Sequence, residues 1–274
     1  MELKGRTALL TGAGGGIGSA VAENLARAGV TLVLSGRNEV SLEALRVTLP
    51  DRDHVVLTAD LGDREQSSTL IKKAEAEAGP IDILINNAGI EDSGTYHLLE
   101  AEEIENMVEL NLLAPMLMTH AVIPGMLERG RGHVVQMSSV AGLAGAACTE
   151  PYAATKGGLV RFTESLRATY ADQPVGFSTV APGFSTGGGM YSRMQSEGHG
   201  SNAFIGSTTV DKVAEAVSKS ITSDVPLIVV NNRPLQPILA VNSLAPRIGA
   251  KILEVSGGNS IFRRIAAERE TPAG

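Results

Sequence analysis

From Thr7 to Val230 the chain alternates between short, continuous apolar runs and longer segments whose apolar positions recur with helical spacing. Continuous apolar runs are typical of parallel strands buried on both faces. The predicted strands are Thr7–Thr11, Thr31–Ser35, His54–Thr58, Ile81–Ile85, His133–Met137, Val175–Val180 and Pro226–Val230. The predicted helices are Gly16–Ala28, Glu39–Leu49, Arg64–Ala78, Glu102–Leu127, Pro151–Tyr170 and Val210–Ile221. This alternation predicts an α/β fold, a three-layer doubly wound parallel sheet with helices on both faces.

The segment from Arg233 onward has a different character. It is apolar, helix-prone and interrupted by prolines, and its six basic and three acidic residues contrast with a net charge of −7 for the whole chain. We therefore expect one domain over residues 1–232 and a basic, apolar helical extension over residues 233–274 that is not an independent domain. Three roles stay open for this extension: contact with a membrane surface, packing on a partner subunit, or a cover over a substrate cleft.

Composition excludes several classes of protein. Of the 274 residues, 43% are hydrophobic and 19% charged, which is ordinary for a globular protein and unlike collagen or a disordered chain. The acidic balance argues against nucleic acid as a partner, because binding to phosphates needs clustered basic residues. The single cysteine, Cys148, excludes an intramolecular disulfide, and the five scattered histidines lack metal-binding spacings, so we expect no metal.

No segment of the sequence predicts a signal peptide or a membrane span. The longest stretch without a charged residue, Leu110–Leu127, is interrupted by Asn111, Pro115, His120 and Pro124, and we interpret it as a buried helix. The expectation is a cytoplasmic protein. The composition also shows 31 glycines against nine aromatic residues, which indicates a backbone that approaches something closely.

A glycine-rich turn joins the first predicted strand to the first predicted helix. Glycines at such a junction let the backbone approach a pyrophosphate, and the helix N-terminus then attracts the anion. The spacing matches neither GxGxxG nor a P-loop, so a purely structural turn is the alternative. The residues concerned are Thr11, Gly12, Gly14, Gly15, Gly16, Ile17 and Gly18.

With three later motifs in the same order, this turn resembles the short-chain dehydrogenase/reductase family. The motifs are Asn86-Asn87-Ala88-Gly89, Ser138-Ser139, and Tyr152 with Lys156, and the resemblance covers roughly residues 4–185. It implies a Rossmann-type fold, a nicotinamide cofactor, and hydride transfer between that cofactor and a carbonyl or secondary alcohol substrate. It also implies a homodimer or homotetramer that pairs through the segments Glu102–Leu127 and Pro151–Tyr170.

Tyr152 and Lys156 lie four residues apart, so they share one face of the predicted helix. An ammonium beside a phenol favours the phenolate, and we therefore expect Lys156 to lower the pKa of Tyr152. A core tyrosine next to a surface lysine is the alternative. Ser139 would hold the carbonyl oxygen, and the family's spacing of serine to tyrosine selects it over Ser138; by the resemblance Lys156 also binds the nicotinamide ribose.

Asn111 precedes Pro115 by four residues. Proline has no N–H, so within one helix the Asn111 carbonyl lacks its usual partner. In the resembling family this carbonyl holds a water that links the lysine to solvent, so Asn111 joins Ser139, Tyr152 and Lys156 as a predicted catalytic residue. A plain proline kink is the alternative.

The end of the second predicted strand bears on the choice of cofactor. Its sequence, Ser35-Gly36-Arg37-Asn38, lacks the acidic residue that binds the ribose of NAD, and Arg37 can pair with a 2′-phosphate. NADP(H) is therefore favoured over NAD(H), although Glu39 keeps NAD(H) open. The resemblance adds as cofactor-binding residues Asp60, Leu61, Asn87, Ala88, Gly89, Tyr152, Lys156, Pro182 and Gly183.

The family pattern ends after Gly183, where Ser185 and Gly187 replace its usual residues and Thr186 is the nearest substitute. The segment Gly187–Asn202 is predicted to be a lid over the site or an ordinary surface loop. An apolar pocket is expected from Leu143, Ala144, Ala146, Met190 and Met194. Cys148 is interpreted as a small pocket-lining or buried residue and not a nucleophile, because no His or Asp motif accompanies it.

Together these features predict an NADP-dependent oxidoreductase, a reductase of a ketone or aldehyde. Two alternatives come from other classes: a non-catalytic sensor of dinucleotides, and a protein associated with a membrane surface through its C-terminal segment. The sequence does not indicate which carbonyl or alcohol compound is the substrate.

Overall fold

The computed structural model describes residues 1–50, 53–188 and 206–270. The predicted segment Gly187–Asn202 therefore lies almost wholly outside the described residues, as do Met190 and Met194 of the predicted pocket.

Within those residues the central element is a parallel sheet of seven strands in the order β3-β2-β1-β4-β5-β6-β9. The strands are β1 (Thr7–Thr11), β2 (Thr31–Gly36), β3 (Val55–Thr58), β4 (Ile83–Asn86), β5 (Gly132–Met137), β6 (Val175–Pro182) and β9 (Leu227–Val230). A two-stranded ladder of β7 (Ser185–Thr186) and β8 (Thr208–Thr209) lies apart from it. The predicted doubly wound fold is confirmed, and every predicted strand forms with small shifts at its ends.

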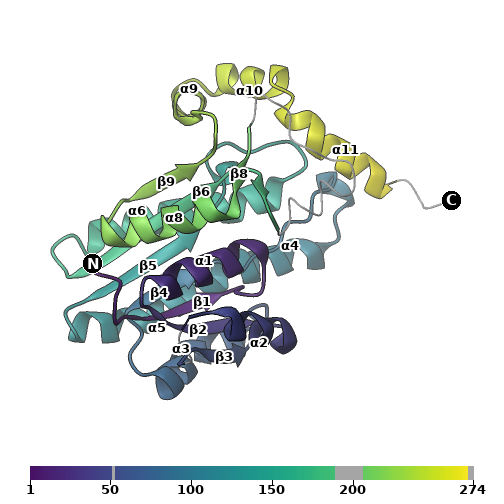
Figure 1. Cartoon of the computed structure of the whole chain (residues 1–274). Coiled ribbons are helices and arrows are strands. Elements are labelled where there is room, and N and C mark those ends of the chain that lie inside the picture. The colour runs from purple at the N-terminus through teal and green to yellow at the C-terminus, as the bar shows by residue number, and fades with distance from the viewer. Residues whose placement is uncertain (51–52, 189–205, 271–274) are drawn as a thin grey trace.

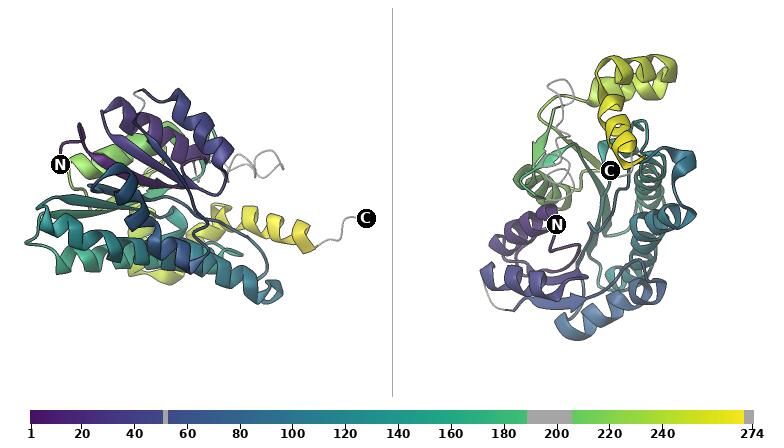
Figure 2. Two further views of the ribbon diagram at one scale, coloured as in Figure 1. Left: turned by 90° about the horizontal axis from the view of Figure 1, so that it is seen from below. Right: turned by 90° about the vertical axis from the view of Figure 1, so that its right-hand side faces the viewer.

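Two layers of helices cover the sheet (Figure 2). Alternate residues of a strand point to opposite faces, so the adjacent Leu9 and Leu10 of β1 belong to different cores. The helices on the Leu10 face are α1 (Gly16–Arg27), α2 (Glu39–Thr48) and α8 (Val210–Thr222). The helices on the Leu9 face are α3 (Arg64–Ala78), α5 (Ala114–Glu128) and α6 (Glu150–Thr169).

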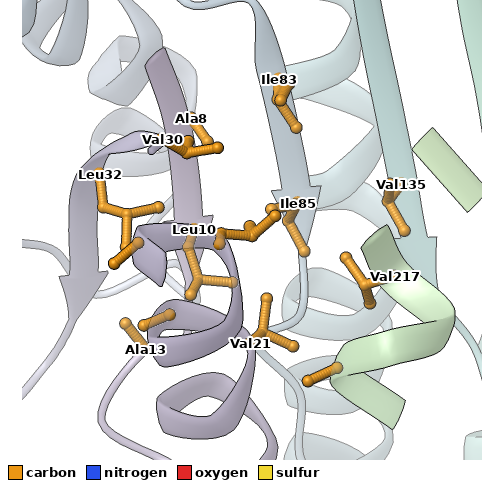
Figure 3. Close-up of a cluster of buried hydrophobic side chains, with 14 of the residues drawn as sticks. Ala8, Leu10, Ala13, Val21, Val30, Leu32, Ile83, Ile85, Val135 and Val217 are labelled. Atoms are coloured by element: carbon orange, nitrogen blue, oxygen red, sulfur yellow. The ribbon is translucent and has the colours of Figure 1, made fainter. Parts of the chain in front are cut away.

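The core under α1 shows why the continuous apolar pattern produces buried strands. Leu10 and Ile85, on neighbouring strands, point toward Val21 of α1 and Val217 of α8 (Figure 3), and none of the four is exposed. Removing such a side chain from water is worth about 1.5–3 kcal/mol. The packing fixes α1 against the strand that precedes it, and so fixes the turn between them.

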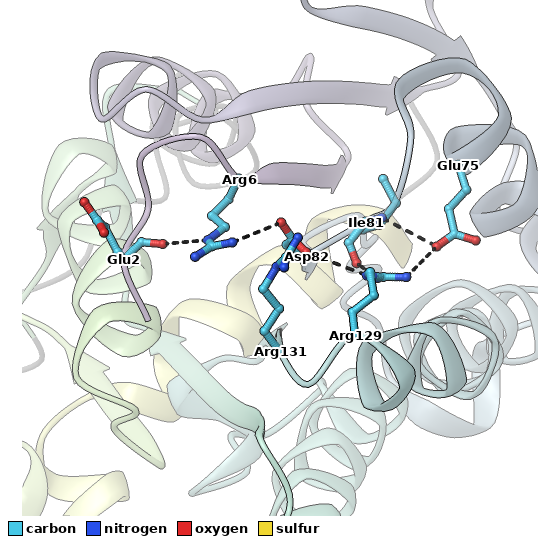
Figure 4. Close-up of polar contacts among 7 residues, drawn as sticks. All are labelled: Glu2, Arg6, Glu75, Ile81, Asp82, Arg129 and Arg131. Carbon is cyan, nitrogen blue, oxygen red and sulfur yellow. Dashed lines mark hydrogen bonds and ion pairs between the residues drawn. The ribbon is translucent and has the colours of Figure 1, made fainter.

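An ionic cluster closes the amino end of the sheet (Figure 4). The Asp82 carboxylate, 4% exposed, lies 3.0 Å from Arg131 Nε, 3.8 Å from Arg6 Nη1 and 3.9 Å from Arg129 Nε. Arg129 also donates a 2.8 Å hydrogen bond to the Ile81 carbonyl. A buried carboxylate needs such partners. β4 begins at Ile83 and not at the predicted Ile81, because the chain bends at Asp82.

The predicted helix Glu102–Leu127 is divided. It consists of α4 (Ala101–Val108), a π-helical turn η2 (Glu109–Leu113) and α5. The whole stretch Ala101–Glu128 is long and apolar enough to cross a membrane by length and composition, but 44% of its most apolar window is buried inside the protein. Met118 and Val122 are fully buried against the sheet, as the sequence analysis expected for this segment.

The residues after Arg233 form three helices, α9 (Gln236–Leu244), α10 (Pro246–Val255) and α11 (Gly258–Glu270). Helices α9 and α10 lie beyond β9 at the outer side of the sheet, and α11 runs past the carboxyl ends of the strands (Figure 1). Ile261 and Ala266 of α11 are each 2% exposed, and the Phe262 ring stacks on Phe184 with 5.9 Å between centroids. Of the three roles left open for the extension, the contacts of α11 support a cover over the cleft.

Candidate active site

The predicted motifs converge on the carboxyl edge of the sheet. From β1 the chain adds β2 and then β3 on one side, and it then returns to place β4 on the other side of β1. The connections that follow β1 and β4 therefore lead to opposite sides of the sheet. Ligands of doubly wound sheets bind in the crevice at this point. The glycine-rich turn follows β1, Asn87–Gly89 follows β4, Ser138 and Ser139 follow β5, and Pro182 ends β6.

The glycine-rich turn needs its glycines for steric reasons. Gly12 has φ of +64°, and a Cβ there would lie 2.9 Å from Ala88 Cα. A Cβ at Gly18 would overlap the Gly12 carbonyl oxygen. Helix α1 starts after Gly15, which offers no side chain to cap the first N–H groups. A helix N-terminus with no side-chain cap, preceded by a glycine-rich turn, fits the pyrophosphate of a dinucleotide.

Thr11 and Asn87 join this turn to the loop after β4. The Thr11 hydroxyl accepts hydrogen bonds from the N–H groups of Asn87 (3.0 Å) and Ala88 (3.1 Å) and donates one to the Ile85 carbonyl. The Asn87 amide donates to the carbonyls of Thr11 (3.0 Å) and Gly12 (3.2 Å). Thr11 is fully buried, so its side chain braces the crevice from behind.

Ser139 and Tyr152 lie side by side in the lining of a cleft of about 210 Å³. Their side chains are hydrogen-bonded, and the Ser139 hydroxyl also accepts a bond from the Ala141 N–H at 3.2 Å. The neighbouring Ser138 hydroxyl instead donates to the Lys156 carbonyl at 2.8 Å. Successive residues therefore have separate tasks: Ser138 fastens the end of β5 to α6, and Ser139 presents its hydroxyl to Tyr152.

The effect of Lys156 on Tyr152 differs from the expectation. Burial, which disfavours the phenolate, raises the pKa of Tyr152 to about 12; the Ser139 hydrogen bond opposes that rise and the Glu91 charge adds to it. Lys156 Nζ lies 5.7 Å from the Tyr152 ring centroid and donates to the Met137 carbonyl at 3.0 Å. The predicted lowering is therefore wrong for this structure, and Tyr152 is a neutral phenol at pH 7.

Lys156 is itself perturbed by burial. It is 4% exposed, and burial lowers its pKa to about 8. A neutral phenol beside an amine that titrates near physiological pH forms a pair that can pass on protons.

Asn111 lies in the π-helical turn η2 and is fully buried. Its carboxamide accepts from the Ile90 N–H (2.9 Å) and donates to the Ile90 carbonyl (2.8 Å) and to the Thr155 hydroxyl (3.4 Å). Pro115, which cannot donate to the Asn111 carbonyl, follows at the start of α5, and π-turns of this kind are frequent at functional sites. The side chain therefore ties the loop after β4 to α6, and the role of the carbonyl stays a prediction.

Gly89 keeps these groups close together. A Cβ at Gly89 would lie 3.0 Å from Asn111 Oδ1 and 3.2 Å from Lys156 Nζ. Ile17 and Pro182 line the cleft from two other sides, together with Gly183 and Asn87. The predicted residues around the nicotinamide end of the crevice are thus brought together.

The predicted adenine-side residues do not line this cleft. Arg37 is exposed directly after β2. Asp60 accepts from the Gly62 N–H at 3.0 Å, and Leu61 is buried in the core at 5% exposure. Asp63, three residues after Asp60, caps α3.

The apolar wall of the cleft was predicted in part. Ala144 and Ala146 line it, whereas Leu143 lies on a different cleft beside α9, so that part of the prediction is wrong. The lining residues that the sequence analysis missed include Glu91, Phe184, Leu253 and Phe262. Glu91 could have been found, because it follows Gly89 closely at the end of β4; the C-terminal residues carry no local signal of their position.

The contacts of Cys148 and Thr186 point to structural roles for both residues. Burial raises the pKa of the Cys148 thiol, so it is not the thiolate that a nucleophile requires. The Thr186 hydroxyl donates to the Thr208 carbonyl at 3.0 Å and thereby holds the β7–β8 ladder together.

Comparison with known proteins agrees with this geometry. Residues 6–197 match the family model described as short chain dehydrogenase. A solved short chain dehydrogenase/reductase family protein superposes with a TM-score of 0.75 at 26% identity, covering 84% of this chain and 97% of that one.

Similarity to individual proteins reaches beyond the residues that the family model matches. The ketoacyl reductase HetN of Nostoc sp. is 34% identical over 253 residues, covering 89% of this chain and 86% of its own length. Nodulation protein G of Rhizobium sp. is 37% identical over 183 residues, and the 3-oxoacyl-[acyl-carrier-protein] reductase FabG of Rickettsia conorii is 34% identical over 184; each alignment covers 67% of this chain and 74% of the relative. The chain therefore belongs to the short-chain dehydrogenase family and is an oxidoreductase that uses a nicotinamide cofactor to act on CH–OH or keto groups.

Proposed function

We propose that this protein reduces a ketone or aldehyde with NADPH. The observation that carries the proposal is the neutral Tyr152 phenol, bonded to Ser139 in a mostly apolar cleft beside the buried Lys156. A phenol that stays protonated is the form that a proton donor to a developing alkoxide requires.

In the proposed mechanism Ser139 and Tyr152 both donate hydrogen bonds to the substrate carbonyl oxygen. This polarises the carbonyl and stabilises the negative charge that develops on its oxygen. The nicotinamide supplies the hydride when bound. Tyr152 then transfers its proton to the oxygen, and Lys156, which titrates near pH 8, is placed to restore it. Asn111 holds Ile90 and so keeps the loop after β4 against this site.

The preference for NADPH rests on Arg37. Its guanidinium is exposed where β2 ends, and Gly36 occupies the position where an acidic residue would select NAD. A guanidinium pairs with a phosphate through two parallel hydrogen bonds. Replacing Arg37 with Met should raise KM for NADPH about tenfold or more and leave KM for NADH nearly unchanged; equal effects on both would refute this preference.

The direction of the reaction is supported by the relatives. Two of the proteins with about one third identity are named for the reduction of keto groups, and the alignment with one of them spans most of this chain. Pairing of subunits through α4–α5 and α6 is part of the same proposal. Sedimentation velocity should therefore give a dimer or tetramer, and a monomer at micromolar concentration would refute this part.

The decisive test is Tyr152→Phe, assayed with NADPH and a panel of ketones and aldehydes. The variant should bind NADPH with near-normal affinity in a fluorescence titration and lose at least about 10³-fold in kcat, because the proton donor is gone. A variant that retains its turnover would refute the mechanism. Arg27→Ala at the end of α1 is the control, because that arginine is exposed and pairs with Glu23.

A further inference from the structure

The substrate cleft contains one acidic side chain among the residues described as lining it, Glu91. The mechanism proposed above does not use it. Its charge contributes to the raised pKa of Tyr152, so the carboxylate lies near the place where the substrate carbonyl would be held. Because the Glu91 carboxylate disfavours the ionisation of Tyr152, its role is not activation of that phenol.

The position of Glu91 is fixed on both sides. The preceding residue, Ile90, is held through both its N–H and its carbonyl by the Asn111 carboxamide. On the other side the Ser93 hydroxyl donates to Glu91 Oε1, and the Gly94 N–H donates to the Cys148 carbonyl at 3.1 Å. A carboxylate held this firmly can select a ligand by geometry.

Helix α11 supports the same loop from outside. Arg269 donates to the Ser93 carbonyl at 3.3 Å and forms an ion pair with Glu103 of α4. The C-terminal extension thus contributes twice to the cleft, through Phe262 in its apolar wall and through Arg269 behind the loop that carries Glu91.

The hydrogen-bonding capacity of Glu91 exceeds what the described residues supply. Burial raises its pKa, and no cation among those residues offsets its removal from water. Lys156, the cation of the cleft, instead donates to the Met137 carbonyl. A carboxylate has about four acceptor sites, and the Ser93 hydroxyl occupies one of them.

We propose that Glu91 determines substrate specificity by accepting a hydrogen bond from a donor group, a hydroxyl or an ammonium, close to the substrate carbonyl. The remainder of the substrate is apolar and lies against Phe184, Leu253 and Phe262. Keto acids are rejected, because their carboxylate would face that of Glu91. This inference rests on the proposed reductase activity and names the class of its substrate.

The test compares four aryl ketones of one skeleton: the parent ketone and its α-hydroxy, α-ammonio and carboxylate analogues. The native protein should reduce the two donor-bearing ketones with kcat/KM about 10- to 100-fold above the parent, as expected for a hydrogen bond to a charged group. The carboxylate analogue should be the poorest substrate.

Two variants separate charge from hydrogen bonding. Glu91→Gln keeps the size and one acceptor oxygen, so it should lose most of the preference for the ammonium ketone and keep part of that for the hydroxy ketone. Glu91→Leu should lose both. Glu77→Gln makes the same exchange at an exposed position of α3, which does not line the cleft, and should leave all four ratios unchanged.

A second measurement protects the test against a merely structural effect. Because the Glu91 charge helps to raise the pKa of Tyr152, Glu91→Gln should move the alkaline limb of kcat/KM to lower pH on the parent ketone. A partly misfolded variant would instead show a lower kcat/KM at every pH, with the alkaline limb at the same pH as in the native protein.

The inference is overturned if Glu91→Gln and Glu91→Leu leave the substrate ratios of the native protein unchanged, or if the native protein shows no preference for the donor-bearing ketones. Absence of reduction of any ketone or aldehyde by the native protein would instead refute the proposed function itself. The two failures are thus distinguishable.

Discussion

Gly142 sets the distance between the serine loop and α6, and Gly142→Ala should therefore separate Ser139 from Tyr152. Gly142 ends the short helix η3 (Val140–Gly142), for which Ser139 is the N-cap. A Cβ on Gly142 would lie 2.5 Å from the Lys156 carbonyl carbon, 2.7 Å from its oxygen and 2.8 Å from the Gly157 nitrogen. All three are backbone atoms of α6, so no side chain can rotate away to make room.

The size of the effect follows from these distances. Ordinary contact begins near 3.4 Å, so the two segments must move apart by about 1 Å. Helix α6 has 20 residues and a buried face, and η3 has three, so η3 should move and carry Ser139 with it. A misplacement of about 1 Å can cost about 10²-fold in rate, and overpacking costs about 1–3 kcal/mol in the free energy of unfolding.

The assay is kcat and KM with NADPH and a reducible ketone, with urea unfolding alongside. Gly145→Ala is the matched control, because a Cβ there would lie 3.6 Å from Ala153 Cβ, an ordinary contact. The control should keep kcat within about twofold, whereas Gly142→Ala should lose about 100-fold. If Gly142→Ala retained both native kcat and native stability, the account of how Ser139 is positioned would be refuted.

Three further predictions concern stability, cofactor and substrate. Burial lowers the pKa of His133 from 6.5 to about 4. As the pH falls, this histidine is therefore protonated in the unfolded chain before it is protonated in the folded one, so stability that is present above pH 6.5 is lost as the pH falls toward 4. Between pH 7.5 and 5 the free energy of unfolding of the native protein, measured in urea, should fall by about 2 kcal/mol through this residue, and His133→Gln should abolish that part of the fall. The control His120→Gln, at an exposed site, should show the same fall as the native protein. Gly18→Ala should weaken NADPH binding about tenfold or more in a fluorescence titration, because its Cβ would overlap the Gly12 carbonyl; native affinity would contradict that packing. Phe262→Ala should lower kcat/KM about tenfold for a bulky aryl ketone and leave that for acetone unchanged; equal losses would argue against an apolar wall.

Local pattern was sufficient to predict the sheet. Each strand carries its own evidence of burial on two faces, and the alternation of strand and helix leaves few topologies once crossovers are right-handed. Leu9 and Leu10 illustrate this, because both are apolar and pack into different cores. The start of β4 was less predictable, since Ile81 is apolar like the residues of the strand and the bend at Asp82 separates it from them.

The division of the predicted helix Glu102–Leu127 shows the limit of periodicity. α4 has an apolar face with helical spacing, whereas α5 is apolar on nearly all sides, so the π-turn between them leaves no break in apolar content. Pro115 marked the place, but proline alone does not distinguish a kink from a π-turn. The contacts of the Asn111 side chain, 21 residues away at Ile90, depend on tertiary structure.

The pKa of Tyr152 is the most informative difference between expectation and structure. The spacing of Tyr152 and Lys156 identifies a pair on one helical face, but the sign of the perturbation depends on burial and on where the amine points. With a pKa of about 12, ionising Tyr152 at pH 7 costs about 7 kcal/mol, whereas its neutral form is ready to donate a proton. Oxidation of an alcohol would need the phenolate and reduction of a carbonyl needs the phenol. The burial that contradicts the sequence-based expectation therefore keeps Tyr152 in the protonated form that the reduction of a carbonyl uses.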